Sequence, residues 1–269
     1  MAIEELKAPY TATEQMVVSA ARQIADGDVI YVGVGLPMQS ALLARRMQAP
    51  HCTIIIENGI VRSDAFPLPN GTDTLASQSF SDQLSGLFHV MCLGQAGHIR
   101  TGFLGGGHID KYGNVNDTCA GDYLKPAHRW PGSGGGNDIM SFCDRTIVVL
   151  EQSKRRFLER VDFNTCPGYF DGKPGRREEA GLRPDTGPCS VITDLAEYVF
   201  VDRELTLKSV HAGVGVTLEK VRAETGWDIK ISPELTETIP PSEEELRILR
   251  ERVRIAPTAG NVAAGKVSR

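Results

Sequence analysis

Apolar residues near the start of the chain fall into short β-branched runs separated by a stretch with helical spacing. Val29-Ile30-Tyr31-Val32 predicts a buried strand, and a glycine turn then leads into residues 38–47, whose apolar positions recur at helical spacing. Thr53-Ile54-Ile55-Ile56 predicts a second buried strand, which the turn signal Asn58-Gly59 terminates. Strands and helices in this order are typical of a parallel sheet covered by helices. The pattern predicts an α/β fold with a mostly parallel open sheet flanked by helices.

The same patterns predict further elements along the chain. A first helix is expected over residues 13–25, with Thr13 as its N-cap. A last helix is expected over 243–253, because Ser242 precedes it and a glutamate three positions later completes a capping box. The other expected elements are a helix end at 87–93, strands at 99–104, 146–150 and 190–193, and a hairpin partner of the last strand at 197–201.

Residues 63–86 are rich in Pro, Gly, Asp and Ser and predict a long loop with short helices. Loops of this length in a compact domain are usually functional, so this one is expected to cover or wall an active site. No change in composition forces the chain to divide. Residues 1–255 are therefore expected to form a single domain, followed by a flexible C-terminal tail over 256–269.

Composition and charge exclude several classes of protein. Hydrophobic residues make up 41% of the chain and charged residues 23%, as in ordinary soluble globular proteins. The net charge of -5 gives no electrostatic reason to bind nucleic acid or an anionic membrane. No stretch approaches the roughly 20 consecutive apolar residues of a membrane span, and the acidic N-terminus does not resemble a secretory signal. A cytoplasmic protein is expected.

The six cysteines are scattered along the chain. They form no Cys-x-x-Cys pair and no Cys/His spacing suited to zinc, so no metal site is expected. Reduced and mostly buried thiols are the expected state.

Glu57 is the leading candidate for chemistry because it follows the second predicted strand directly. Open α/β sheets place their active sites at the carboxyl ends of their strands. A carboxylate at this point is either a solvated strand terminus or a group held in a cleft for nucleophilic attack or proton exchange. The local sequence alone slightly favours the structural interpretation.

The turn Gly33-Val34-Gly35 resembles the start of a dinucleotide-binding fingerprint, but Met38 stands where the third glycine is needed. A nicotinamide site is therefore not expected. The turn is either a tight strand-to-helix connection or a set of backbone N–H groups that face an anion or a developing oxyanion. The residues alone weigh these two interpretations equally.

A second glycine-rich segment covers residues 132–136. It lacks the lysine of a phosphate-binding P-loop and the Gly-x-Ser-x-Gly pattern of a serine hydrolase. Its successive N–H groups favour an anion-binding nest over a merely flexible loop, with Asn137 and Asp138 expected to cap the helix that follows.

His108 is the best placed of the six histidines to act as a base, although a hydrogen-bonded polar role is favoured. The basic cluster 154–156 is a solvated helix face, a subunit contact or a phosphate-binding group.

Taken together, these segments resemble the beta subunits of family I coenzyme A transferases, and most closely those of the glutaconate type. The matching runs include residues 32–37, 54–59, 106–116, 132–135 and 224–227. The likeness covers almost the whole chain in order, which is more specific than any single motif. It implies a fold of the CoA-transferase/ribose-phosphate-isomerase type and a hetero-oligomer with an alpha-type partner that helps to wall the active site.

The resemblance also implies the roles of particular residues. The family's nucleophilic glutamate falls on Glu57, which would form a glutamyl-CoA thioester. Inferred donors to an oxyanion or to CoA are Gly33, Val34, Gly35, Gly134 and Gly135. An acyl-CoA and a small carboxylic acid would be the substrates, with no tightly bound cofactor and no metal.

Asn58 leaves the acid substrate open between short dicarboxylyl-CoA and 3-oxoacyl-CoA. The glutaconate enzyme has serine at this position, whereas Glu-Asn-Gly is common among ketoacid-type members. Two alternatives to CoA transfer also stay open. The first is an acyl-CoA hydrolase, decarboxylase or carbon–carbon bond-cleaving enzyme with Glu57 as a base, and the second is a non-catalytic CoA-binding or scaffold subunit.

Overall fold

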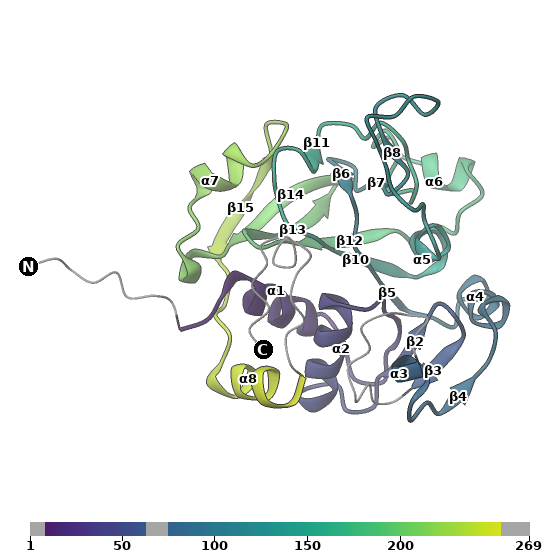
Figure 1. Ribbon diagram of the computed structural model, residues 1–269. Coiled ribbons are helices and arrows are strands. Elements are labelled where there is room, and N and C mark those ends of the chain that lie inside the picture. Colours follow the sequence, from purple (N-terminus) through teal and green to yellow (C-terminus); the bar gives the residue numbers. More distant parts are fainter. Residues whose placement is uncertain (1–8, 63–74, 254–269) are drawn as a thin grey trace, which may run out of the picture.

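The computed structural model describes residues 9–62 and 75–253 (Figure 1). Five adjacent strands at the centre of its main sheet run parallel to one another. In spatial order they are β12 (Pro188–Ile192), β10 (Arg145–Val149), β5 (Thr101–Leu104), β1 (Val29–Tyr31) and β2 (Thr53–Ile56). Their carboxyl ends therefore meet at one edge of the sheet.

Antiparallel pairs extend this centre on both sides. Beyond β2 lie β3 (Ile60–Arg62) and β4 (Gln83–Leu84). Beyond β12 lie β13 (Ala196–Val201) and β14 (Glu204–Val210), and β15 (Lys230–Glu237) then pairs parallel with β14. The resulting ten-stranded sheet is mixed but parallel at its centre, so the expected fold class is confirmed.

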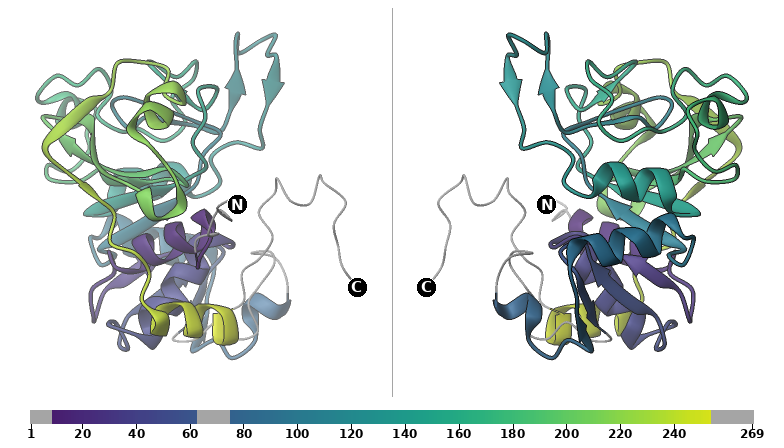
Figure 2. Two further views of the ribbon diagram at one scale, coloured as in Figure 1. Left: turned by 90° about the vertical axis from the view of Figure 1, so that its left-hand side faces the viewer. Right: turned by 90° about the vertical axis from the view of Figure 1, so that its right-hand side faces the viewer.

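Helices cover both faces of the sheet. On one face, α1 (Ala12–Ala21) packs against α2 (Leu36–Arg46), which contacts α8 (Glu243–Ile248). On the other face, α4 (Leu87–Gln95) lies beside α5 (Gly136–Phe142), as Figure 2 shows at right. The segment expected to be only a helix end at 87–93 is thus part of a complete helix.

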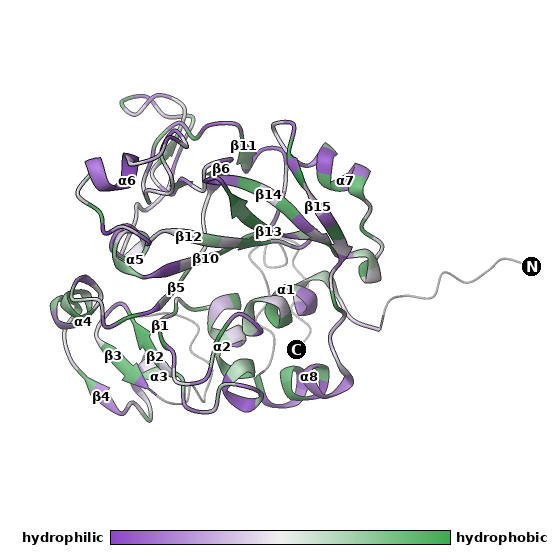
Figure 3. Cartoon of the chain, turned by 180° about the vertical axis from the view of Figure 1, so that it is seen from behind, coloured by the Kyte–Doolittle hydropathy of each residue, from purple (hydrophilic) through white to green (hydrophobic). Residues whose placement is uncertain are grey.

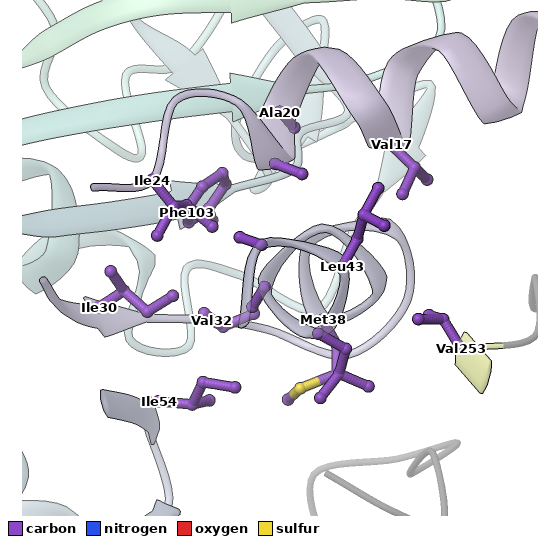
Figure 4. Close-up of a cluster of buried hydrophobic side chains, with 14 of the residues drawn as sticks. Val17, Ala20, Ile24, Ile30, Val32, Met38, Leu43, Ile54, Phe103 and Val253 are labelled. Carbon is purple, nitrogen blue, oxygen red and sulfur yellow. The ribbon is translucent and has the colours of Figure 1, made fainter. Parts of the chain in front are cut away.

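Each face of the central strands belongs to a separate hydrophobic cluster. Figure 4 shows the first cluster, in which Ile30 and Ile54 meet side chains of α1 and α2. The second cluster joins Tyr31 and Ile55 to side chains of α4 and α5. Strands buried on both faces need apolar residues at every position, which explains the unbroken β-branched runs in the sequence.

Smaller elements surround the main sheet. A three-stranded sheet contains β11 (Phe157–Leu158), β6 (His108–Asp110) and β7 (Val115–Asn116). The hairpin β8 (Cys119–Ala120) and β9 (His128–Arg129) projects from the body of the molecule (Figure 2). The remaining elements are α3 (Leu75–Gln78), α6 (Arg176–Glu179), α7 (Leu218–Ala223) and a 3-10 turn at Ala212–Val214. Figure 3 shows that α6 is strongly hydrophilic, in contrast to the central strands.

Several predicted helix boundaries differ from the structure. The helix expected over 13–25 ends at Ala21, and the helix expected over 38–47 covers Leu36–Arg46. The first helix begins at Ala12, and Thr11 rather than Thr13 is its N-cap, because Thr11 and Glu14 form a reciprocal capping box. Thr13 has no glutamate three positions later. The Ser242 capping box is confirmed, but the last helix changes to a π-helix over Leu249–Val253.

Two expectations fall wholly or partly outside the described residues. Of the long loop expected over 63–86, residues 63–74 are not described, and the rest contains α3 and β4. The tail expected over 256–269 is likewise not described.

Within residues 9–62 and 75–253, no helix is long and apolar enough to cross a membrane.

Candidate active site

A cavity of about 260 Å³ opens where the parallel strands of the main sheet end. Glu57 follows β2 directly and lines this cavity. This agrees with the expectation that a carboxylate directly after the strand lies at the strand's carboxyl end. The ends of β1, β5 and β10 supply most of the other walls. The lining is otherwise apolar or glycine, and in the described part of the chain Glu57 contributes its only carboxylate.

The Glu57 carboxylate is held by a backbone group from the second glycine-rich segment. The N–H of Gly135 donates a hydrogen bond to Glu57 Oε2 at 2.7 Å. A hydrogen bond from an uncharged N–H to a carboxylate is stronger than one between neutral groups. This contact joins two segments that are 78 positions apart in the sequence.

Glycine at position 135 leaves room for this close approach. A Cβ on Gly135 would lie 2.5 Å from Glu57 Oε2 and 2.7 Å from Met91 Cε, which is closer than non-bonded atoms tolerate. Gly134 has φ +49°, and a Cβ there would lie 3.4 Å from Glu57 Oε1. Both glycines therefore lie close to the Glu57 carboxylate.

The first glycine turn reaches the same cavity. Gly33 and Val34 line it together with Glu57. Gly35 has φ +89°, caps α2 and is not part of the lining, so the turn itself explains its glycine. Of the five inferred donor positions, the structure brings four to the Glu57 site and leaves Gly35 behind it.

The expected capping of α5 by Asn137 and Asp138 is wrong. The helix begins at Gly136 with Gly135 as its N-cap and has no side-chain cap. Asn137 lies inside the first turn, and its side-chain amide donates to the carbonyl oxygen of Thr165 at 2.8 Å instead. Asp138 lies in the same turn, where a carboxylate interacts favourably with the helix dipole.

His108 lies outside the lining of the Glu57 cavity. Its ring makes an edge contact with Trp130, with 4.8 Å between centroids. Burial lowers the pKa of His108. Its Nδ1 atom has no hydrogen-bond partner among the described residues, so the expected hydrogen-bonded role is not met at that atom.

The cluster 154–156 forms a turn, so its interpretation as a helix face is wrong. Arg156 lies 3.8 Å from a carboxylate oxygen of Glu151.

All six cysteines are free thiols. Over the described ranges, no group of three or more His, Cys, Asp or Glu side chains is arranged to hold a metal ion.

Sequence reasoning missed several residues of the site. Leu104 and Gly105 line the cavity at the end of β5, and the strand-end rule that selected Glu57 could have found them. Met91 comes from α4, and Ile139 from α5. Neither helix carries a motif that points to the site, since their positions depend on tertiary packing.

The chain is similar to known coenzyme A transferases over most of its length. A family model described as coenzyme A transferase matches residues 13–222. The beta subunit of 3-oxoadipate CoA-transferase from Pseudomonas knackmussii is 38% identical over 245 residues, which cover 90% of this chain and 92% of that protein. The beta subunit of glutaconate CoA-transferase from Acidaminococcus fermentans is 34% identical over 250 residues, with coverage of 91% and 92%.

A solved structure gives the same result. The crystal structure of glutaconate coenzyme A-transferase from Acidaminococcus fermentans matches with a TM-score of 0.84 at 33% identity. The match covers 91% of this chain and 95% of that chain. The resemblance expected from the sequence is confirmed.

Proposed function

The chain belongs to the coenzyme A transferase family, and we propose that it is the beta subunit of an enzyme that transfers CoA through a glutamyl-CoA thioester on Glu57. The observation that carries the proposal is the position of the Glu57 carboxylate. It lies in the cavity at the strand ends and accepts a hydrogen bond from the Gly135 N–H.

The first half of the reaction uses Glu57 as a nucleophile. Its Oε1 attacks the carbonyl carbon of the acyl-CoA thioester, and the C–S bond breaks to give a mixed anhydride and the CoA thiolate. The thiolate then attacks Cδ of Glu57, which releases the original acid as a carboxylate and leaves a glutamyl-CoA thioester. An acceptor carboxylate takes the place of the original acid by the same steps in reverse.

The two glycine segments would stabilise different oxyanions. When the thiolate attacks Cδ of Glu57, negative charge develops on Oε2, which already accepts from the Gly135 N–H. The turn at Gly33 and Val34, which lines the same cavity, would serve the oxyanion that forms on the substrate carbonyl. Removing one preorganised donor of this kind typically costs about 10²–10³ in rate.

The acyl group is proposed to be a short dicarboxylyl or 3-oxoacyl group. The names of the 3-oxoadipate and glutaconate relatives support this range. An activity screen of this chain, co-expressed with an alpha-type partner, would compare glutaconyl-CoA, 3-oxoadipyl-CoA and acetyl-CoA as donors. A preference for acetyl-CoA over both others would contradict the proposed substrate class.

Replacement of Glu57 tests the nucleophile. Glu57→Gln is expected to lower kcat by about 10⁴-fold or more, because the amide is a poor nucleophile. Mass spectrometry of the wild-type complex after addition of acyl-CoA should show CoA bound covalently to the peptide that contains residue 57. Glu244→Gln removes an exposed carboxylate on α8 and serves as the matched control.

Detection of a covalent Glu57-CoA adduct distinguishes CoA transfer from the alternative functions of the same fold. A hydrolase or carbon–carbon bond-cleaving enzyme with Glu57 as a base would lose activity in Glu57→Gln but would form no Glu57-CoA adduct. A scaffold subunit would show neither effect. Full activity of Glu57→Gln would end the proposal.

The alpha-type partner is proposed to dock on the surface around residues 75–88. This segment holds half of the ten exposed large hydrophobic side chains of the described residues, among them Phe80 at 80% exposure and Phe88 at 81%. Exposed apolar side chains gathered in one place mark interaction surfaces. The segment also borders the site, because the Ser85 N–H donates to the Gly59 carbonyl, two positions after Glu57.

Substitution of one aromatic side chain tests this surface. Phe88→Asp is expected to weaken the complex with the partner at least about tenfold, because a central aromatic contact often contributes about 2 kcal/mol or more. Ile239→Asp changes a similarly exposed apolar residue elsewhere and should leave the affinity unchanged. Equal co-purification of the two variants would place the interface on another surface.

A further inference from the structure

A second cavity, of about 550 Å³, lies at the opposite edge of the main sheet. Asp144, directly before β10, and Pro188, the first residue of β12, both line it. Because β10 is five residues long and a strand rises ~3.3 Å per residue, this cavity lies about 16 Å along the strand from the Glu57 site. It shares no lining residue with the cavity at Glu57.

Arg177 supplies a buried positive charge to the wall of this cavity. Its side chain is only 6% exposed. Its Nη1 donates to the carbonyl oxygens of Pro167 and Gly168, and its Nη2 donates to the carbonyl of Met140 and the hydroxyl of Thr186. In the described residues none of its partners is a carboxylate, and its Nε–H has no acceptor.

An uncompensated buried charge is costly in a folded protein. The four acceptors of Arg177 carry only partial negative charge, and the charge of the exposed Glu178 acts on the guanidinium without forming an ion pair with it. A negative charge near it would lower this cost. The cavity is the space in which such a charge could be placed.

Arg203 adds a second guanidinium from the turn between β13 and β14. It is half-buried and lines the cavity. No carboxylate of the described residues forms an ion pair with it. Its backbone has φ +67°, in the left-handed region that side chains other than glycine rarely adopt.

Tyr169 links the two arginines. Burial raises the pKa of Tyr169, and the charges of Arg177 and Arg203 both oppose this rise, so both guanidinium groups act on the same hydroxyl. The hydroxyl donates to the carbonyl oxygen of Pro188 at 2.9 Å. Tyr169 therefore lines the same cavity as the two arginines, and both of their charges lower its pKa.

The carboxylates of the cavity occupy its rim. Glu178, Asp185 and Asp202 are exposed, and Asp144 forms an ion pair with Arg183 at 3.0 Å. Charges in water are screened, whereas charges at depth act in a medium of lower dielectric constant. The interior of the cavity is thus governed by the arginines even though its rim carries both signs.

We propose that this cavity is a second binding site, which takes a small anion through carboxylate or phosphate oxygens. Arg203 contacts the anion directly, and Arg177 compensates its charge from the wall. The site is separate from the one at Glu57 and does not depend on the function proposed for that residue.

Calorimetric titration of the full-length chain, with its co-purified partner where one is retained, tests the site. Inorganic phosphate and citrate are used as separate probes at constant ionic strength, which distinguishes the two kinds of oxyanion. Saturable binding of at least one probe is expected. Arg203→Gln should weaken it about tenfold or more, because charged hydrogen bonds to an anion are strong, and Arg203→Lys should retain most of the affinity.

Two control variants make the result specific. Arg222→Gln removes an exposed arginine on α7 and should bind the probe as the wild type does. Glu57→Gln should also leave the affinity unchanged. Absence of saturable binding, equal weakening by Arg203→Gln and Arg222→Gln, or a large effect of Glu57→Gln would each overturn the proposal.

Discussion

The two edges of the main sheet present ionic groups in opposite ways. At the carboxyl edge, Glu57 is the single carboxylate among apolar and glycine walls, and its side chain accepts a hydrogen bond from the backbone N–H of Gly135. At the amino edge, charged side chains of both signs line a larger cavity, and its deepest charge is the guanidinium of Arg177. Backbone donors are fixed by the fold, whereas exposed charged side chains adjust to what they bind.

This difference fits two different functions at the two edges of the sheet, stabilisation of oxyanions at one and binding of an anion at the other. A reaction with developing oxyanions gains most from donors that do not reorganise, because their orientation is already set before the charge appears. Binding of an anion gains more from full charges that compensate it. The same parallel strands thus separate the site proposed for the reaction from the site proposed for anion binding.

The largest effect is expected at the carboxyl edge. Gly135→Ala should lower kcat about 10²–10³-fold, because its Cβ would collide with Glu57 Oε2 and displace the N–H donor. The measurement is kcat of the complex with saturating acyl-CoA. Glu244→Gln, which changes an exposed carboxylate on α8 away from this site, is the control. Wild-type kcat in Gly135→Ala would show that this edge does not depend on its fixed donor.

A smaller effect is expected on stability at the amino edge. Arg177→Met should reduce the free energy of unfolding by about 2–3 kcal/mol, because four buried acceptors lose their donor. Urea denaturation of the full chain measures this change. The corresponding exposed variant, Arg222→Met, should differ from the wild type by less than about 0.5 kcal/mol. Equal stability of both variants would mean that the cavity wall does not rely on Arg177.

The smallest effect concerns coupling between the edges. The changes in kcat caused by Gly135→Ala and Arg203→Gln should combine additively to within about 0.5 kcal/mol, since the two cavities share no lining residue. A double-mutant cycle on kcat measures the coupling. A larger interaction energy would join the two edges into one functional unit.

The sequence predicted the centre of the fold well because its signals there are local. A β-branched run specifies a buried strand, and the residue after it lies at the strand end, so Glu57 could be placed from a few neighbouring positions. Helix starts were less certain. Thr11 and Thr13 are both plausible caps, and only the position of Glu14 relative to Thr11 distinguishes them.

The remainder of the candidate site could not be predicted because it depends on contacts between distant segments. Met91 approaches Gly135 only because α4 packs beside α5, and no local pattern encodes that packing. Arg177 and Arg203 similarly reach one cavity from different parts of the chain. Residue types indicated that each could carry charge, but not that both side chains line the same cavity.

The burial of the central strands on both faces has a consequence for the position of the carboxylate. Side chains of a strand point alternately to opposite faces, and Ile55 belongs to the cluster on the side of α4 and α5. Glu57 is two residues further on, in the turn that follows β2, and the N–H of Gly135 reaches it from that side. Insertion or deletion of one residue between Ile55 and Glu57 would turn the carboxylate toward α1 and α2. The spacing of two residues therefore sets which layer of helices the Glu57 carboxylate faces.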